Sequence, residues 1–295
     1  MSELDKFLSY LRSEKRMSAH TLTAYRGDLE QFLAFLGRTF EEQDLVKVSS
    51  VMVRSWLAEL KQEGYSSTSI HRKRSTLSAF YKYARRSGWI ATDPVSKSVA
   101  PRKEKRLPGF VDEQSMENLL EGESIFTEDF FGLRDRVLVT LLYECGIRRA
   151  ELIGIKDGDV DMEKCQLKVL GKRNKERLIP ISEGTVDLLR EYLNYRAEAV
   201  TCDHSHFLCT NSGSKLYPKF VYERVNHYLG RVSTLSKRSP HILRHTFATH
   251  LLNNGAQLNT VKELLGHSSL AATQVYTHNT IEKLKSIHEQ NHPKG

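Results

Sequence analysis

Hydrophobic residues in roughly the first 90 positions recur every three or four residues, which is the spacing of amphipathic helices. The second such segment has Ser18 and Thr21 as candidate caps at its start, and Gly37 stands where it should end. The pattern predicts four helices, at residues 3–13, 19–36, 50–62 and 67–87. We therefore expect an all-helical N-terminal domain over residues 1–92.

After residue 108 the pattern mixes helical and strand periods. Two short runs rich in strand-forming residues, QLKVL and RLIPI, flank GKRNKE and predict a hairpin within residues 160–181. Helices are predicted at residues 112–120, 134–143, 183–199, 218–231, 241–253, 258–265 and 280–289, with another beginning at Arg148. We expect a mostly helical C-terminal domain with a small antiparallel three-stranded sheet over residues 109–295, joined by a proline-rich, charged linker at residues 93–108.

Composition narrows the class of protein. The 295 residues suit two domains, because single cores seldom grow past about 250 to 300 residues. A net charge of +8 favours a polyanionic partner, and nucleic acid ahead of a membrane, because no basic amphipathic helix or lipidation motif stands out. The N-terminus lacks the apolar core of a signal peptide and no run of 18 apolar residues occurs, which predicts a cytoplasmic protein.

The positive charge is concentrated between His71 and Arg106. This window has eleven Lys or Arg against Asp93 and Glu104, so it carries +9 and the rest of the chain about −1. Such a surface can follow a phosphate backbone, although a solvated basic face and a flexible linker would give the same pattern. The candidate DNA contacts on its helical part are Arg72, Lys73, Arg74, Lys82 and Arg85.

One cluster has the residue types of a zinc site, namely Cys202, His204, His206 and Cys209. Alternation along an extended strand would point Cys209 away from the other three, so we expect no metal there. The sequence also shows no carboxylate cluster for a two-metal nuclease. If the chain cuts DNA, we expect it to do so without metal.

Residues 240–276 carry side chains that suit work on a phosphodiester. His241 and Arg244 share one face beside the first turn of a predicted helix, and a helix N-terminus attracts anions. His267 and Tyr276 follow, and a tyrosine phenol can act as a covalent nucleophile. A surface pair and a half-buried tyrosine would be the plainer interpretations, so this stretch alone only raises the hypothesis of phosphoryl transfer.

The rest of the chain can supply the remaining parts of such a site. Metal-free phosphoryl transfer needs a nucleophile, fixed positive donors for the phosphate oxygens and an acid for the leaving oxygen. Arg148 and Arg244 can each fork onto a phosphate. Lys172, on the predicted hairpin, can reach a leaving oxygen.

Five motifs, in order, resemble those of the tyrosine recombinases: GIRRAEL, GKRNKERLIPI, PHILRHTFATHLL, LLGHSSLAATQVYTH and the terminal HP. TLTAYRGDLEQF and the basic helix after it are similar to the family's core-binding domain, so the resemblance covers essentially the full length. Within the family the chain looks like the Xer type, which resolves chromosome dimers. The resemblance implies a SAM-like helical core-binding domain, a catalytic domain and no cofactor.

The resemblance assigns a role to each chemical residue. Tyr276 would attack the scissile phosphate, form a 3′-phosphotyrosyl link and release a 5′-hydroxyl. Lys172 would protonate the leaving 5′-oxygen. His241 would accept or orient the tyrosine proton, and His267 would hydrogen-bond the phosphate.

The same resemblance implies the supporting residues. Arg148 and Arg244 would stabilise the pentacoordinate phosphate, and Glu151, one helical turn after Arg148, would hold that arginine. Arg173 stands where Xer proteins usually have glycine, so Lys175 is an alternative to the first hairpin lysine as the acid. Arg173 and Lys175 are also candidate DNA contacts.

The implied assembly is a tetramer on two duplexes that exchanges strands through a Holliday junction, alone or with a second related recombinase. A septal DNA translocase is the implied activator. Residues 280–289 would dock into a neighbouring protomer, or else fold back on their own domain. The alternatives are an integrase of a mobile element, with the same chemistry, and a DNA-binding protein that does not cleave.

Overall fold

The structure is a computed structural model that describes residues 2–98, 109–122, 124–171, 175–201, 206–266 and 290–293. The chain forms two compact units, Met1–Arg106 and Leu107–Gly295, which we describe one at a time. Within the described ranges, every helix is too short or too polar to span a bilayer.

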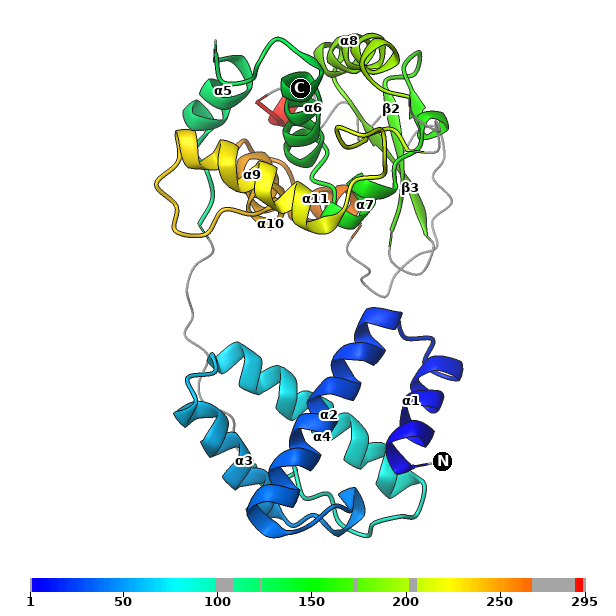
Figure 1. The fold of residues 1–295 in the computed structure, drawn as a ribbon. Helices are drawn as coiled ribbons and strands as arrows, with labels where there is room; N and C mark the ends of the chain where they lie inside the picture. The colour runs from blue at the N-terminus through cyan, green and yellow to red at the C-terminus, as the bar shows by residue number, and fades with distance from the viewer. Residues whose placement is uncertain are drawn as a thin grey trace. The chain divides into compact units, whose positions relative to one another are not determined.

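The described part of the N-terminal unit is built from helices (Figure 1). They are α1 Glu3–Ser13, α2 Ala19–Phe40, α3 Ser50–Gln62 and α4 Ser67–Arg86, with a 3₁₀ turn, η1, at Leu45–Lys47. Each α-helix begins after a serine whose hydroxyl accepts an N–H from the first turn, a donor that would otherwise lack a partner. Their apolar faces meet in a core that includes Phe7, Phe32, Trp56 and Phe80. The four predicted helices are confirmed.

Helix α2 does not end at Gly37, as the sequence predicted. It continues to Phe40, whose ring packs edge-on against Phe35 at a centroid distance of 5.8 Å. Glu41 takes the left-handed conformation that ends the helix, with φ of 54°, and its N–H donates to the carbonyl of Leu36. Packing of Phe40 therefore outweighs the helix-stopping preference of glycine.

The C-terminal unit is mostly helical in its described residues. Its helices are α5 Glu113–Glu121, α6 Phe130–Glu144, α7 Arg149–Gly154, α8 Glu183–Ala199, α9 Pro218–Val232, α10 Pro240–Asn253 and α11 Leu258–Leu264, with a 3₁₀ turn, η2, at Asp157–Asp159. Helix α6 runs through the middle of the unit and packs against α7, α8, α9 and α10 (Figure 1). It carries buried residues on all sides and so organises the core.

Helix α6 begins four residues earlier than the predicted residue 134. Asp129 caps it, with Oδ1 accepting the N–H of Gly132 at 2.8 Å. The helix predicted at residues 280–289 lies outside the described residues, as do residues 99–108 of the predicted linker.

A three-stranded antiparallel sheet of order β1-β2-β3 lies beside α7 and α8 in Figure 1, and β2 packs against α7. The strands are β1 Val160–Asp161, β2 Gln166–Leu170 and β3 Glu176–Pro180. The register pairs Val169 with Arg177 and Leu167 with Ile179, and all four of these residues are buried. The predicted fold class, mainly helical with one small antiparallel three-stranded sheet, is confirmed.

Candidate active site

A glycine turn between α6 and α7 brings Arg148 to the start of α7. Gly146 has φ of +55°, and a Cβ there would lie 2.4 Å from the ring of Phe247 on α10, so neither the backbone conformation nor the space admits a side chain. The carbonyl of Gly146 accepts a hydrogen bond from Arg244 Nη1. The turn therefore places two predicted catalytic arginines in one neighbourhood.

Glu151 holds Arg148 by two bonds. Its Oε2 accepts the backbone N–H of Arg148 at 2.8 Å, and its Oε1 accepts Nη1 of the Arg148 guanidinium at 2.8 Å. The glutamate side chain is 4% exposed, whereas that of Arg148 is 35% exposed. The expected contact between the two residues is present, and Arg148 remains open to solvent.

Arg244 is buried in the first turns of α10. Besides Gly146, it donates through Nη2 to the carbonyl of Leu265. Burial and the nearby charge of Arg148 lower the pKa of Arg244 to about 10, which still leaves it protonated at neutral pH.

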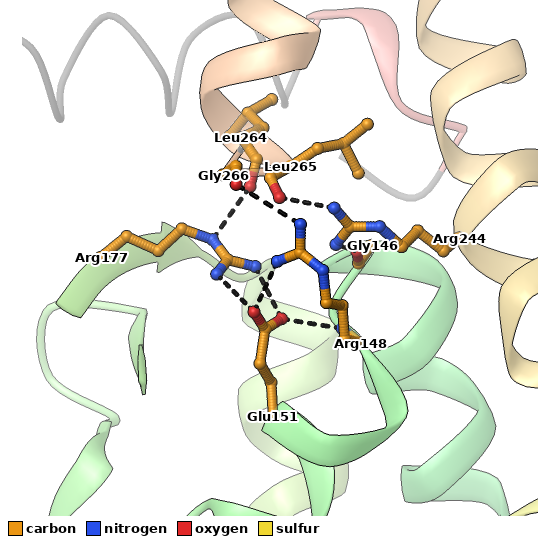
Figure 2. A network of polar contacts seen from close by, with 8 residues as sticks. All are labelled: Gly146, Arg148, Glu151, Arg177, Arg244, Leu264, Leu265 and Gly266. Atoms are coloured by element: carbon orange, nitrogen blue, oxygen red, sulfur yellow. Dashed lines mark hydrogen bonds and ion pairs between the residues drawn. The ribbon is translucent and has the colours of Figure 1, made fainter. Parts of the chain in front are cut away.

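A third arginine, Arg177 on β3, joins this cluster and was not predicted. Its Nη1 and Nη2 donate to the two oxygens of Glu151 at 3.0 and 2.9 Å, and its Nε donates to the carbonyl of Leu264 at 3.2 Å. Figure 2 shows Arg148 and Arg177 converging on the Glu151 carboxylate, with Arg244 beside them under the end of α11. Burial alone would raise the pKa of Glu151, but the bonds and charge of Arg177 and the bonds from Arg148 lower it to about 2.

Only some of the remaining predicted residues lie in the described part of the chain. His241 is the exposed second residue of α10, one turn before Arg244, and Lys175 is exposed just before β3. Lys172, Arg173, His267 and Tyr276 lie outside the described residues. The described segment ends at Gly266, whose carbonyl accepts Arg148 Nη2 at 3.4 Å.

The basic residues of α4 in the N-terminal unit differ in how they are used. Lys82 and Arg85 are exposed. Arg72 is about half exposed and pairs with Asp28. Arg74 donates through Nη2 to the carbonyl of Ser98 at 2.9 Å.

Lys73 is buried, unlike an ordinary DNA-contacting lysine. Its ammonium donates to Asp28 Oδ1 at 3.0 Å and also to Gln31. Because a buried carboxylate needs a charge partner, Lys73 serves the interior of the unit, and we leave it out of the DNA surface proposed below.

No group of three or more Asp, Glu, His or Cys residues is arranged to hold a metal ion within the ranges that the structure describes. Of the cluster with zinc-ligand types, residues 202–205 lie outside these ranges. Cys209 is buried, with its Sγ 3.8 Å from the hydroxyl of Tyr192.

Comparison with known protein families assigns both units. A family model described as the phage integrase family matches residues 110–283, more than half of the chain. A second, described as the phage integrase N-terminal SAM-like domain, matches residues 4–88. The chain belongs to the phage integrase family.

Relatives and solved structures make this family membership more specific. The chain is 37% identical to the tyrosine recombinase XerC of Chlorobaculum parvum, over 98% of this chain and 94% of that protein. It is 38% identical to the tyrosine recombinase XerD of Proteus mirabilis, over 99% and 93%. A crystal structure of the XerH site-specific recombinase, bound to a palindromic difH substrate after cleavage, shares the fold with a TM-score of 0.71 and 23% identity, over 96% of this chain and 82% of that one. The predicted family, the Xer-type tyrosine recombinases, is confirmed, and the protein is a site-specific DNA recombinase.

The sequence did contain a signal that Arg177 is a buried residue with a charged partner. In the predicted strand RLIPI, alternation places Arg177 on the same face as Ile179, which reads as a core position. A charged residue at a core position needs a buried partner. What the sequence could not give was the partner, because Glu151 lies 26 residues earlier, on α7.

Proposed function

We propose that this recombinase cuts and rejoins DNA through a 3′-phosphotyrosyl intermediate at Tyr276 and exchanges strands through a Holliday junction. Its cellular task would be to resolve chromosome dimers at cell division. The proposal rests on the chemistry of the arginine cluster, together with the family of the chain.

The observation that carries the proposal is the convergence of Arg148 and Arg244. Arg148 reaches the carbonyl of Gly266 and Arg244 that of Leu265, so both guanidinium groups lie at the point from which the chain continues to His267. With Arg177 and Glu151 the cluster contains three guanidinium groups and one carboxylate, a net charge of +2 (Figure 2). Such a cluster suits the non-bridging oxygens of a phosphodiester, whose charge grows in the transition state.

The proposed step conserves atoms and charge. The Tyr276 oxygen forms a bond to phosphorus while the bond from phosphorus to the 5′-oxygen breaks, and the phenolic proton passes to His241. Lys172 gives a proton to the departing 5′-oxygen, and His267 hydrogen-bonds the phosphate. Because the phosphotyrosine preserves a phosphodiester bond, the reverse attack by a 5′-hydroxyl rejoins the strand. The arginines would supply the positive charge that other enzymes take from a metal ion.

The proposed working form is a tetramer on two duplexes in the cytoplasm, where chromosomal DNA is accessible. Its protomers would be this chain alone or this chain with a second related recombinase, with a septal DNA translocase as activator. The exposed Lys82 and Arg85 on α4, with Arg72, would hold the phosphate backbone, as would Arg173 and Lys175 on the hairpin.

The test is covalent trapping on DNA. The recombination site is first located by mapping the positions on genomic DNA that the protein binds, whether or not it is covalently attached there. A duplex of that site with a nick beside the scissile phosphate then loses its 5′-hydroxyl fragment by diffusion, so the adduct accumulates. We expect a protein–DNA adduct that survives denaturing electrophoresis.

The matched control is Tyr276→Phe, which should bind the same duplex and give no adduct. A wild-type protein that binds a specific duplex tightly and forms no adduct on it would be a DNA-binding protein without cleavage activity, and the proposal would fail.

A further inference from the structure

We propose that Arg177 is a positioning residue of the recombinase, which acts through Glu151 to place Arg148 and fixes the end of α11 at the same time. The inference rests on the proposed function, because it assigns Arg148 to the scissile phosphate. It concerns a residue that is buried and does not itself reach the DNA.

The position of Arg177 joins three parts of the catalytic unit. It comes from β3, its two terminal nitrogens hold Glu151 on α7, and its Nε holds the carbonyl of Leu264 at the end of α11. Its side chain is 6% exposed, so these bonds are shielded from water. A shift of any one part therefore disturbs the other two.

Arg177 also determines how strongly Arg148 is neutralised. Glu151 is buried and ionised, and it needs positive charge nearby. With Arg177 bound to both of its oxygens, Arg148 contributes only one side-chain bond to the carboxylate, and its guanidinium stays partly exposed. Without Arg177, Arg148 would be the main charge partner of Glu151 and would be drawn inward, away from a phosphate.

Two glycines pack against the Arg177 side chain, so the backbone on both sides of it approaches closely. A Cβ on Gly171 would lie 3.5 Å from Nη1, and a Cβ on Gly266 would lie 3.2 Å from Cδ. Gly266 also has φ of +61°, which favours glycine. In the sequence these glycines come directly before Lys172 and His267. The backbone that leads into both predicted catalytic residues is therefore packed on Arg177.

Lysine cannot reproduce this arrangement. A single ammonium group has no planar fork, so it cannot bind both oxygens of Glu151 and the Leu264 carbonyl from one fixed position. Arg177→Lys keeps the charge but loses the geometry, which makes it the informative variant.

The experiment compares Arg177→Lys with Arg196→Lys in the full-length protein. Arg196 is an equally buried arginine of the same unit. It is forked onto Asp157 at 2.9 and 2.8 Å and bonded to the carbonyl of Phe207, and these partners in the described part of the chain lie outside the Glu151 cluster. For each variant we would measure the thermal midpoint, the affinity for the nicked duplex and the single-turnover rate of adduct formation at saturating protein.

We expect Arg177→Lys to lower the adduct rate on the order of 10- to 100-fold with little change in DNA affinity. Arg196→Lys should lower the thermal midpoint by a similar amount and leave the adduct rate near that of wild type. In an Arg148→Lys background, adding Arg177→Lys should cost little more, because the two act as one unit. Equal loss of rate in both single variants, or full additivity with Arg148→Lys, would reduce Arg177 to a stabilising residue and overturn the proposal.

A second measurement separates this inference from the proposed function. Hydrogen exchange of the peptide spanning residues 147–152 reports the bond from the Arg148 N–H to Glu151 and needs no cleavage. It should speed up in Arg177→Lys and not in Arg196→Lys, and unchanged exchange would refute the positioning role. A wild-type protein that gives no adduct would count against the proposed function alone.

Discussion

At the scale of single residues, the identity of the acid is the first question to test. We expect Lys172→Ala to lower the adduct rate by about 100- to 10,000-fold, the usual contribution of a general acid. A duplex with a 5′-sulfur leaving group should restore that rate, because a thiolate departs without protonation. Lys175→Ala, at the exposed position just before β3, is the matched control and should need no rescue. Rescue of Lys175→Ala instead would reassign the acid.

The residues of the site differ in how well the sequence reveals them. The contact between Arg148 and Glu151 follows from their three-residue spacing across one helical turn, so it was predictable. The bond from Arg177 to Glu151 joins a strand to a helix, and only the folded chain brings the two together. For Lys73 the sequence was misleading. Its place in the basic window predicted a DNA contact, whereas in the folded chain its ammonium pairs with the buried Asp28.

At the scale of elements, His250 ties α10 to its neighbours and makes stability depend on pH. Its Nε2 donates to the carbonyl of Val111, 2.8 Å away, and its Nδ1 accepts from the Tyr143 hydroxyl of α6 at 2.9 Å, an arrangement that suits neutral imidazole. Burial lowers the pKa of His250, against the opposing effects of Glu113, the Val111 carbonyl and Asp112.

The lowered pKa of His250 makes the folded state less stable at acidic pH. At pH values between the pKa of His250 in the folded chain and its unfolded value near 6.5, the unfolded chain binds more protons than the folded chain. The contribution of His250 to the free energy of unfolding is therefore complete above pH 6.5 and falls as the pH drops below 6.5. Urea unfolding at pH 7.5 and 5.5 should show a smaller loss in His250→Gln than in wild type. His241→Gln, an exposed histidine of the same helix, should behave like wild type. An equal loss in His250→Gln would refute the prediction.

Periodicity predicted most of the elements and failed at particular ends. The start of α6 was missed because a helix buried on all sides carries no polar face to mark its limits, and the cap at Asp129 stands five residues before the predicted start. The end of α2 was missed because Phe40 packs on Phe35 after the glycine. Local signals place a helix, and tertiary packing decides where it stops.

At the scale of the whole molecule, the change from a purely helical period to a mixed one near the charged linker predicted two domains, at residues 1–92 and 109–295. The folded chain forms two compact units, Met1–Arg106 and Leu107–Gly295. Of the candidate catalytic residues, the sequence predicted the order along the chain and not the arrangement in space. What the fold adds is that Arg148, Arg177 and Arg244, spread over 97 residues, lie in one cluster with a single carboxylate (Figure 2).

The separation of charge between the units leads to a prediction about DNA binding. The window from His71 to Arg106 carries +9, and Lys82 and Arg85 are among its exposed basic residues on α4. If each contacts a phosphate, Lys82→Ala and Arg85→Ala should each weaken DNA binding and reduce the slope of log affinity against log salt by about 0.9.

Two control variants test whether the change in slope is specific. Lys61→Ala, exposed on α3 outside this window, should leave the slope unchanged. Lys73→Met should lower the stability of the fold and leave the slope unchanged, because the Lys73 ammonium pairs with Asp28 and not with DNA. Equal slopes in all four variants would mean that the basic window serves solubility and that the recombinase holds DNA through its catalytic unit alone.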